Sequence, residues 1–221
     1  MKRDHRVEPV RPAVVAHLFL VAAVVAATVG AATGVTRADS TPTASTSTAP
    51  AKRFVIEPMH TFPSLEMTHL GISTWRGKFN RTRGTIELDR TARTGRVEVE
   101  VEVASIDWGL DLMNEYSLRP DWLDAAQHPV MRYVGAIEFD DTRPAALVGE
   151  LTLRGVTRPL RLSIDHFACV PHPLTKRELC GADASGELHR ADFGMTQYAD
   201  GELGRIRFRV QVEANPVEDP V

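Results

Sequence analysis

The sequence lacks the residue patterns from which catalytic and metal sites are usually recognised. Only two cysteines occur in 221 residues, so a disulfide can support the fold but cannot be its framework. The motifs Cys-x-x-Cys, Gly-x-Ser-x-Gly and His-Glu-x-x-His are absent, and the eight histidines are scattered along the chain. We therefore expect no enzyme, no metal site and no cofactor.

A strong excess of charge is also lacking. The net charge is −3. The first 38 residues carry five cations and two anions, so the remainder has a net charge of −6. A mildly acidic domain offers no basic surface for a phosphate backbone, so we expect no nucleic acid partner.

Long hydrophobic runs are limited to the amino terminus. Residues 13–32 are almost entirely apolar; basic residues precede them and the small residues of Thr36-Arg37-Ala38 follow. This order predicts a secretory signal peptide over 1–38, followed by a Ser/Thr/Pro spacer over 39–51. The apolar run is also close to the length of an uncleaved membrane anchor, although its alanine-rich composition favours cleavage. The predicted location is periplasmic or secreted, with anchoring as the alternative.

A folded domain is predicted over 52–215, followed by a short tail over 216–221. Its most regular stretch is 96–104, where Val97, Val99, Val101 and Val103 alternate with Glu98, Glu100 and Glu102. Alternation with period two places the valines on one face of a strand and the glutamates on the other. Antiparallel sheets commonly have one dry and one wet face, so this stretch predicts an antiparallel sheet.

The same alternation recurs in about eight segments separated by short turns. Helical spacing is limited to residues 111–119, with a second short helix expected from an Asp121 cap. Eight strands with one helical insertion predict an all-β domain, either a sandwich or a closed antiparallel barrel. The strands are long and interrupted by glycines such as Gly77, which we interpret as bends or bulges where the sheet curls, so we favour the barrel.

Five segments in this order resemble the YceI-like family. They are His60 with 65–79, Ser105–Asp107, Leu118–Asp124 with His128-Pro129, Gly149–Pro159 and Arg190–Met195. The resemblance implies an eight-stranded, lipocalin-like barrel that is exported in many members and binds polyisoprenoid chains in its lumen. Two departures are Ser117, where the family often has histidine, and Pro63, inside a usually regular strand. If that histidine helps to hold a head group in the family, its absence here leaves open which head group, if any, this protein binds.

The apolar strand faces are the candidate ligand-binding residues. The predicted lumen residues are Leu65, Met67, Val99, Val101, Tyr133, Phe139, Leu151, Leu162 and Phe208. The residue pattern by itself is compatible with a packed core, whereas the family resemblance favours a cavity inside the barrel. A lipid chain needs no specific polar partner, so such a cavity leaves little trace in a sequence.

Two polar residues extend the candidate site. His69 shares a strand face with Leu65 and Met67 and is expected to point inward, where it either meets a ligand or bonds a neighbouring carbonyl. Arg190 either binds a phosphate or, as we favour, pairs locally with Asp192. Trp75, Trp108 and Trp122 either rim the opening or pack elsewhere.

Cys169 and Cys180 are predicted to form a disulfide that closes a polar loop, since an exported protein meets an oxidising compartment.

The leading hypothesis is an exported protein that sequesters or carries a long-chain isoprenoid, such as a quinone or a prenyl phosphate. One alternative is an enzyme or stress-response factor that uses His69 and Arg190 on a small substrate. The other is an interaction module with a filled core. The spacer favours a position near a membrane, and a homodimer is a further association that the sequence leaves open.

Overall fold

The computed structural model describes residues 51–217, so the predicted signal peptide and nearly all of the spacer lie outside the described residues. One α-helix, α1 (Asp111–Ser117), accompanies short 3-10 turns at Val103–Ser105, Arg190–Phe193 and Gly201–Gly204. The strands are β1 (Lys52–Ile56), β2 (Phe62–His69), β3 (Ser73–Phe79), β4 (Thr82–Asp89), β5 (Thr94–Glu102), β6 (Ile106–Asp107), β7 (Val130–Asp140), β8 (Arg143–Leu153), β9 (Val156–Pro171), β10 (Glu178–His189) and β11 (Arg205–Pro216).

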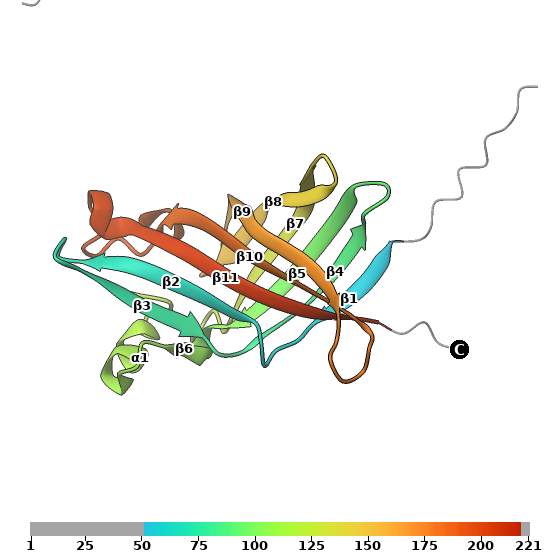
Figure 1. The fold of residues 1–221 in the computed structure, drawn as a ribbon. Helices are drawn as coiled ribbons and strands as arrows, with labels where there is room; N and C mark the ends of the chain where they lie inside the picture. Colours follow the sequence, from blue (N-terminus) through green and yellow to red (C-terminus); the bar gives the residue numbers. More distant parts are fainter. Residues whose placement is uncertain (1–50, 218–221) are drawn as a thin grey trace, which may run out of the picture. The chain divides into compact units, whose positions relative to one another are not determined.

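These strands form one closed antiparallel sheet (Figure 1). The order β1-β4-β5-β7-β8-β9-β10-β11 returns to β1, because β1 pairs with the end of β11. The first half of β11 pairs instead with β2, which pairs with β3, which pairs with β6. Thus β1 and β2 act as one barrel strand, as do β3 with β4 and β5 with β6. The predicted eight-stranded barrel with one helical insertion is confirmed.

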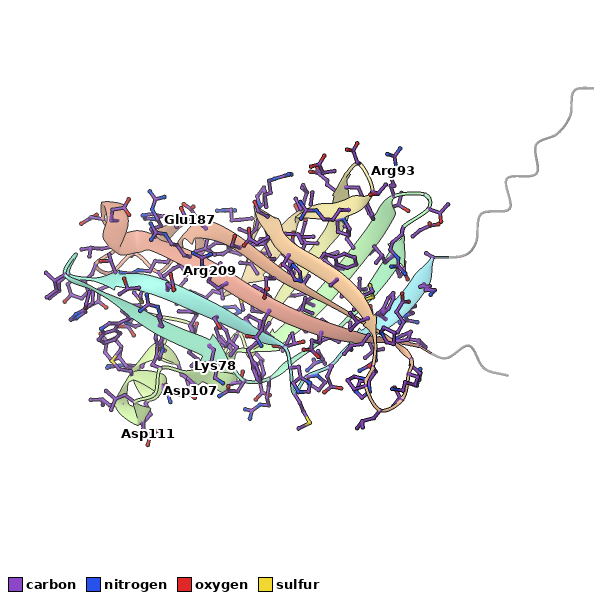
Figure 2. The ribbon with its side chains drawn as sticks, in the orientation of Figure 1. Lys78, Arg93, Asp107, Asp111, Glu187 and Arg209 are labelled. Carbon is purple, nitrogen blue, oxygen red and sulfur yellow. A yellow bond between two sulfur atoms is a disulfide. The ribbon has the colours of Figure 1, made fainter. Side chains whose placement is uncertain are left out.

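Alternation along β5 separates the inside from the outside of the barrel. Val97 and Val101 are buried, whereas Glu98 and Glu102 lie on the outer face and bind arginines of neighbouring strands. The hydrogen bond from Arg132 lowers the pKa of Glu98, and that from Arg81 lowers the pKa of Glu102. Figure 2 shows other charged side chains, such as Glu187 and Arg209, pointing away from the barrel. The inward face of β5 is therefore left to apolar residues.

The corner between β1 and β2 is held by a buried hydroxyl. Thr61 is only 1% exposed. Its Oγ1 donates to the carbonyl of Glu213 at 3.3 Å and accepts from the Glu213 amide at 3.1 Å. The side chain thus takes over the pairing with β11 where the backbone of the first barrel strand bends.

Thr61→Val is expected to lower the free energy of unfolding by about 1–3 kcal/mol, because the buried Glu213 amide loses its acceptor. Urea denaturation followed by circular dichroism measures this change. Thr61→Ser keeps the hydroxyl and is the matched control, with a smaller expected loss. A valine variant as stable as the wild type would contradict this role of the hydroxyl.

The helical insertion between β6 and β7 differs in part from expectation. The first predicted helix is present as α1, but the second, expected from Asp121, is wrong. Residues 121–127 form successive turns, and Asp124 has a left-handed φ of 47° that interrupts any helical run. Within 51–217, no helix has the length and apolar character needed to cross a membrane.

The two ends of the barrel carry different parts of the chain. The hairpin β2–β3 and the turn Gly201–Gly204 lie at the left in Figure 1, with α1 below them, whereas β1 and the end of β11 lie at the right. The register agrees, since β11 pairs with Met67 near its start and with Phe54 at its end.

Candidate functional site: an apolar lumen with a polar mouth

The barrel encloses a central cavity of about 150 Å³ lined almost entirely by carbon. The lining comes from the inward positions of the barrel strands, as alternation predicts. Six predicted lumen residues line it: Val99, Val101, Tyr133, Leu151, Leu162 and Phe208. Phe139, the next-to-last residue of β7, packs against the core but does not line this cavity or the two described below.

Two further cavities follow toward the α1 end. An intermediate cavity of about 60 Å³ shares Met131 and Phe208 with the central one, and Leu65 and Met67 also line it. A mouth cavity of about 330 Å³ shares five residues with the intermediate one. They are Met67, Trp108, Ser117, Trp122 and Arg190. The three cavities therefore follow one another from the rim into the barrel.

Few polar groups face the central cavity. The hydroxyl of Tyr133 donates to the carbonyl of Leu160 at 3.1 Å, and burial raises the pKa of this phenol to about 12. The buried hydroxyl of Thr82 has no partner within residues 51–217. A lumen of this kind suits a ligand that is almost wholly hydrocarbon.

All three tryptophans line the mouth cavity, which agrees with the first of the two alternatives, a rim around the opening. The ring of Trp75 stacks on His69 with centroids 4.7 Å apart. The indole Nε1 of Trp108 donates to the hydroxyl of Ser117 at 2.7 Å, and Gly77 leaves room for the Trp108 ring on β3. Strands β2 and β3 pair in regular register at Gly77, so no bulge is present there.

His69 lies at this rim rather than deep in the barrel. Its side chain is exposed and lines the mouth cavity, with Trp75 as its packing partner. We expected His69 to point inward because it shares a strand face with Leu65 and Met67. It lies at the rim of the barrel instead, because it is the last residue of β2.

Arg190 is buried, with 2% of its surface exposed. Its guanidinium donates to the carbonyls of Leu203, Met195 and Tyr198 at 3.4, 3.2 and 2.5 Å. The expected pair with Asp192 is wrong, since the turn after β10 leaves that carboxylate exposed while the guanidinium turns inward. Burial lowers the pKa of Arg190.

Trp122 covers one face of this guanidinium, with the Arg190 Cζ 4.7 Å from the ring centroid. Arg154, in the turn between β8 and β9, holds the segment by donating to the carbonyls of Pro120 and Trp122. Sequence reasoning missed the Arg154 contacts because they depend on the path of residues 118–129. It missed the Ser117 contact because that contact depends on how α1 lies beside Trp108.

The predicted Cys169–Cys180 disulfide is present. Strand β9 continues past Cys169 to Pro171, and β10 begins at Glu178, two residues before Cys180. The expected polar loop is therefore reduced to residues 172–177. The two cysteines face each other in the β9–β10 register, and Cys180 lines the central cavity.

A closed antiparallel barrel with an apolar lumen belongs to the architectures that can hold one small ligand. Residues 54–217 match the family model of the YceI-like domain. The chain therefore belongs to the YceI-like family, as its sequence motifs indicated.

Relatives and solved structures agree with this assignment. A protein named UPF0312 from Pseudomonas syringae is 31% identical over 106 residues, which are 47% of this chain and 55% of that protein. The chain thus matches about half the length of its Pseudomonas relatives.

Two solved structures share the fold. A Campylobacter jejuni YCEI protein variant is 25% identical with a TM-score of 0.59, covering 69% of this chain and 91% of that one. A domain from Saccharophagus degradans, described as polyisoprenoid binding, is 11% identical with a TM-score of 0.51, covering 76% and 99%.

Proposed function

We propose that this protein binds a long-chain isoprenoid lipid in its barrel and sequesters or carries it outside the cytoplasm. The observation that carries this proposal is the succession of three cavities from the rim into an apolar lumen. Transfer of hydrocarbon into such a space gains about 25 cal/mol per Å² of apolar surface removed from water. The polyisoprenoid-binding description of the Saccharophagus degradans domain with the same fold supports this choice of ligand.

Binding rather than catalysis is the activity that we assign to the mouth. The rival function requires His69 and Arg190 to act together on a small substrate. Arg190 is instead engaged with three backbone carbonyls, and His69 stacks on Trp75 at the exposed rim. No hydrogen bond links the two side chains within residues 51–217.

Export is part of the proposal. Its support is the signal-peptide pattern of 1–38 and the Cys169–Cys180 disulfide, which is compatible with an oxidising compartment. The spacer over 39–51 supports a position near the membrane if the apolar segment is retained. A homodimer stays a prediction.

Protein purified without detergent from two bacterial hosts is expected to carry an isoprenoid that organic extraction and mass spectrometry identify. Delipidated protein is then expected to bind geranylgeraniol, a C20 isoprenoid alcohol, in a fluorescence displacement assay. An extract free of lipid from both hosts, together with no binding of geranylgeraniol, would rule out the carrier.

A further inference from the structure

A buried positive charge stands where the lumen meets the mouth. Arg190 lines both the intermediate and the mouth cavities. Its three hydrogen-bond acceptors are neutral carbonyls, and none of its bonds or ion pairs within 51–217 involves a carboxylate. A guanidinium has five N–H donors, so two are left for another acceptor.

A second donor without a partner lies beside it. The indole Nε1 of Trp122 is buried and has no hydrogen-bond partner in the described domain, whereas that of Trp108 is satisfied by Ser117. Buried polar groups are nearly always hydrogen-bonded, so a buried donor without a partner calls for an explanation. Trp122 lines the same two cavities as Arg190.

The walls of these cavities supply no negative charge. Neither aspartate nor glutamate lines the central, intermediate or mouth cavity of the described barrel. The buried cation therefore has carbonyls and an aromatic ring as neighbours but no carboxylate within the described domain, although a buried charge normally has a partner of opposite sign.

We propose that Arg190 and Trp122 form the receptor for the phosphate head of a prenyl phosphate whose chain occupies the lumen. This inference rests on the proposed function, since the chain and the head are parts of one ligand. The chain provides affinity in the central cavity, and the phosphate provides the missing counter-charge and acceptors at the inner edge of the mouth.

An anionic head fits these groups better than an uncharged one. A quinone carbonyl or an alcohol accepts hydrogen bonds but leaves the guanidinium charge uncompensated. Phosphate oxygens accept from several donors at once, and their negative charge adds an attraction to the guanidinium that an uncharged head lacks. Arginine is well suited to phosphate because its donors lie in a fixed fork.

The test compares geranylgeranyl phosphate with geranylgeraniol, which share a chain and differ in the head. The delipidated wild type is expected to bind the phosphate at least tenfold more tightly. Inorganic phosphate at 10 mM is included as a competitor, since displacement of the prenyl phosphate by the free ion would assign the site to a free anion instead.

Two variants probe the receptor separately. Arg190→Met is expected to abolish the preference for geranylgeranyl phosphate, so that the ratio of the two dissociation constants falls close to one. Trp122→Phe keeps an aromatic ring over the guanidinium but removes the N–H, and is expected to weaken phosphate binding threefold to tenfold. Arg119→Met is the matched control, because Arg119 is an exposed arginine on the neighbouring Tyr116 ring.

The outcomes separate this inference from the proposed function. Equal binding of both probes by the wild type, or an unchanged phosphate preference in Trp122→Phe, would overturn the receptor and leave the carrier intact. Failure of both probes would overturn the carrier and the receptor with it. Circular dichroism tells whether Arg190→Met still folds; if it does not, Trp122→Phe alone decides.

Discussion

Val99→Trp is expected to weaken the binding of geranylgeraniol at least tenfold while the barrel stays folded. Val99 lines the central cavity and is half-buried, although its neighbours on the same face, Val97 and Val101, are buried. Its remaining exposed surface therefore faces the lumen, and a larger side chain there occupies the space of the ligand. Displacing only two methylene groups costs about 1.6 kcal/mol, which is already more than tenfold in affinity.

Val148→Trp is the control for this prediction. It makes the same chemical change on the outward face of β8, where Val148 is 39% exposed. We expect unchanged affinity for geranylgeraniol, measured by the same displacement assay. Equal affinities of the two variants and the wild type would place the ligand outside the central cavity.

Removal of the disulfide is expected to lower the free energy of unfolding by about 3 kcal/mol, the value of the chain-entropy model for a loop of this size. For a domain of this length, the loss corresponds to a fall in melting temperature of roughly 6–12 °C. The double variant Cys169→Ala with Cys180→Ala, followed by thermal and urea unfolding, measures it.

Reduction supplies the control for the disulfide. Dithiothreitol should destabilise the wild type to the level of the double variant and leave the double variant unchanged. Equal stability of the oxidised and reduced wild type would show that pairing of β9 with β10 makes the cross-link redundant, because the two cysteines already face each other in the sheet.

The barrel could be predicted from the sequence because the alternation of inward and outward side chains is set within each strand. The valines of β5 lie inward and its glutamates outward, as their spacing predicts. Eight of the nine apolar residues proposed for the lumen line one of the central or intermediate cavities. The exception, Phe139, lies next to the end of β7. Alternation predicts the face on which a side chain lies but not how far along the barrel the cavity extends.

The mouth was harder to predict because its contacts join segments distant in sequence. Arg190 was expected to bind the nearest carboxylate, Asp192, but its partners lie on the turns that follow, up to Leu203. Trp122 was expected on a helix, and it lies instead in turns that Arg154 holds from the β8–β9 connection. Only the closed sheet brings these residues together.

The pairing of Phe54 with Pro216 has a practical consequence. It brings the first and last strands of the domain together at the pole opposite the tryptophan rim, where β11 pairs with Met67. A purification tag or solid support attached directly before Lys52 or after Pro216 therefore leaves the entrance unobstructed. A sensor chip loaded with oriented molecules would present every entrance to the solution, so lipid uptake could be followed on immobilised protein.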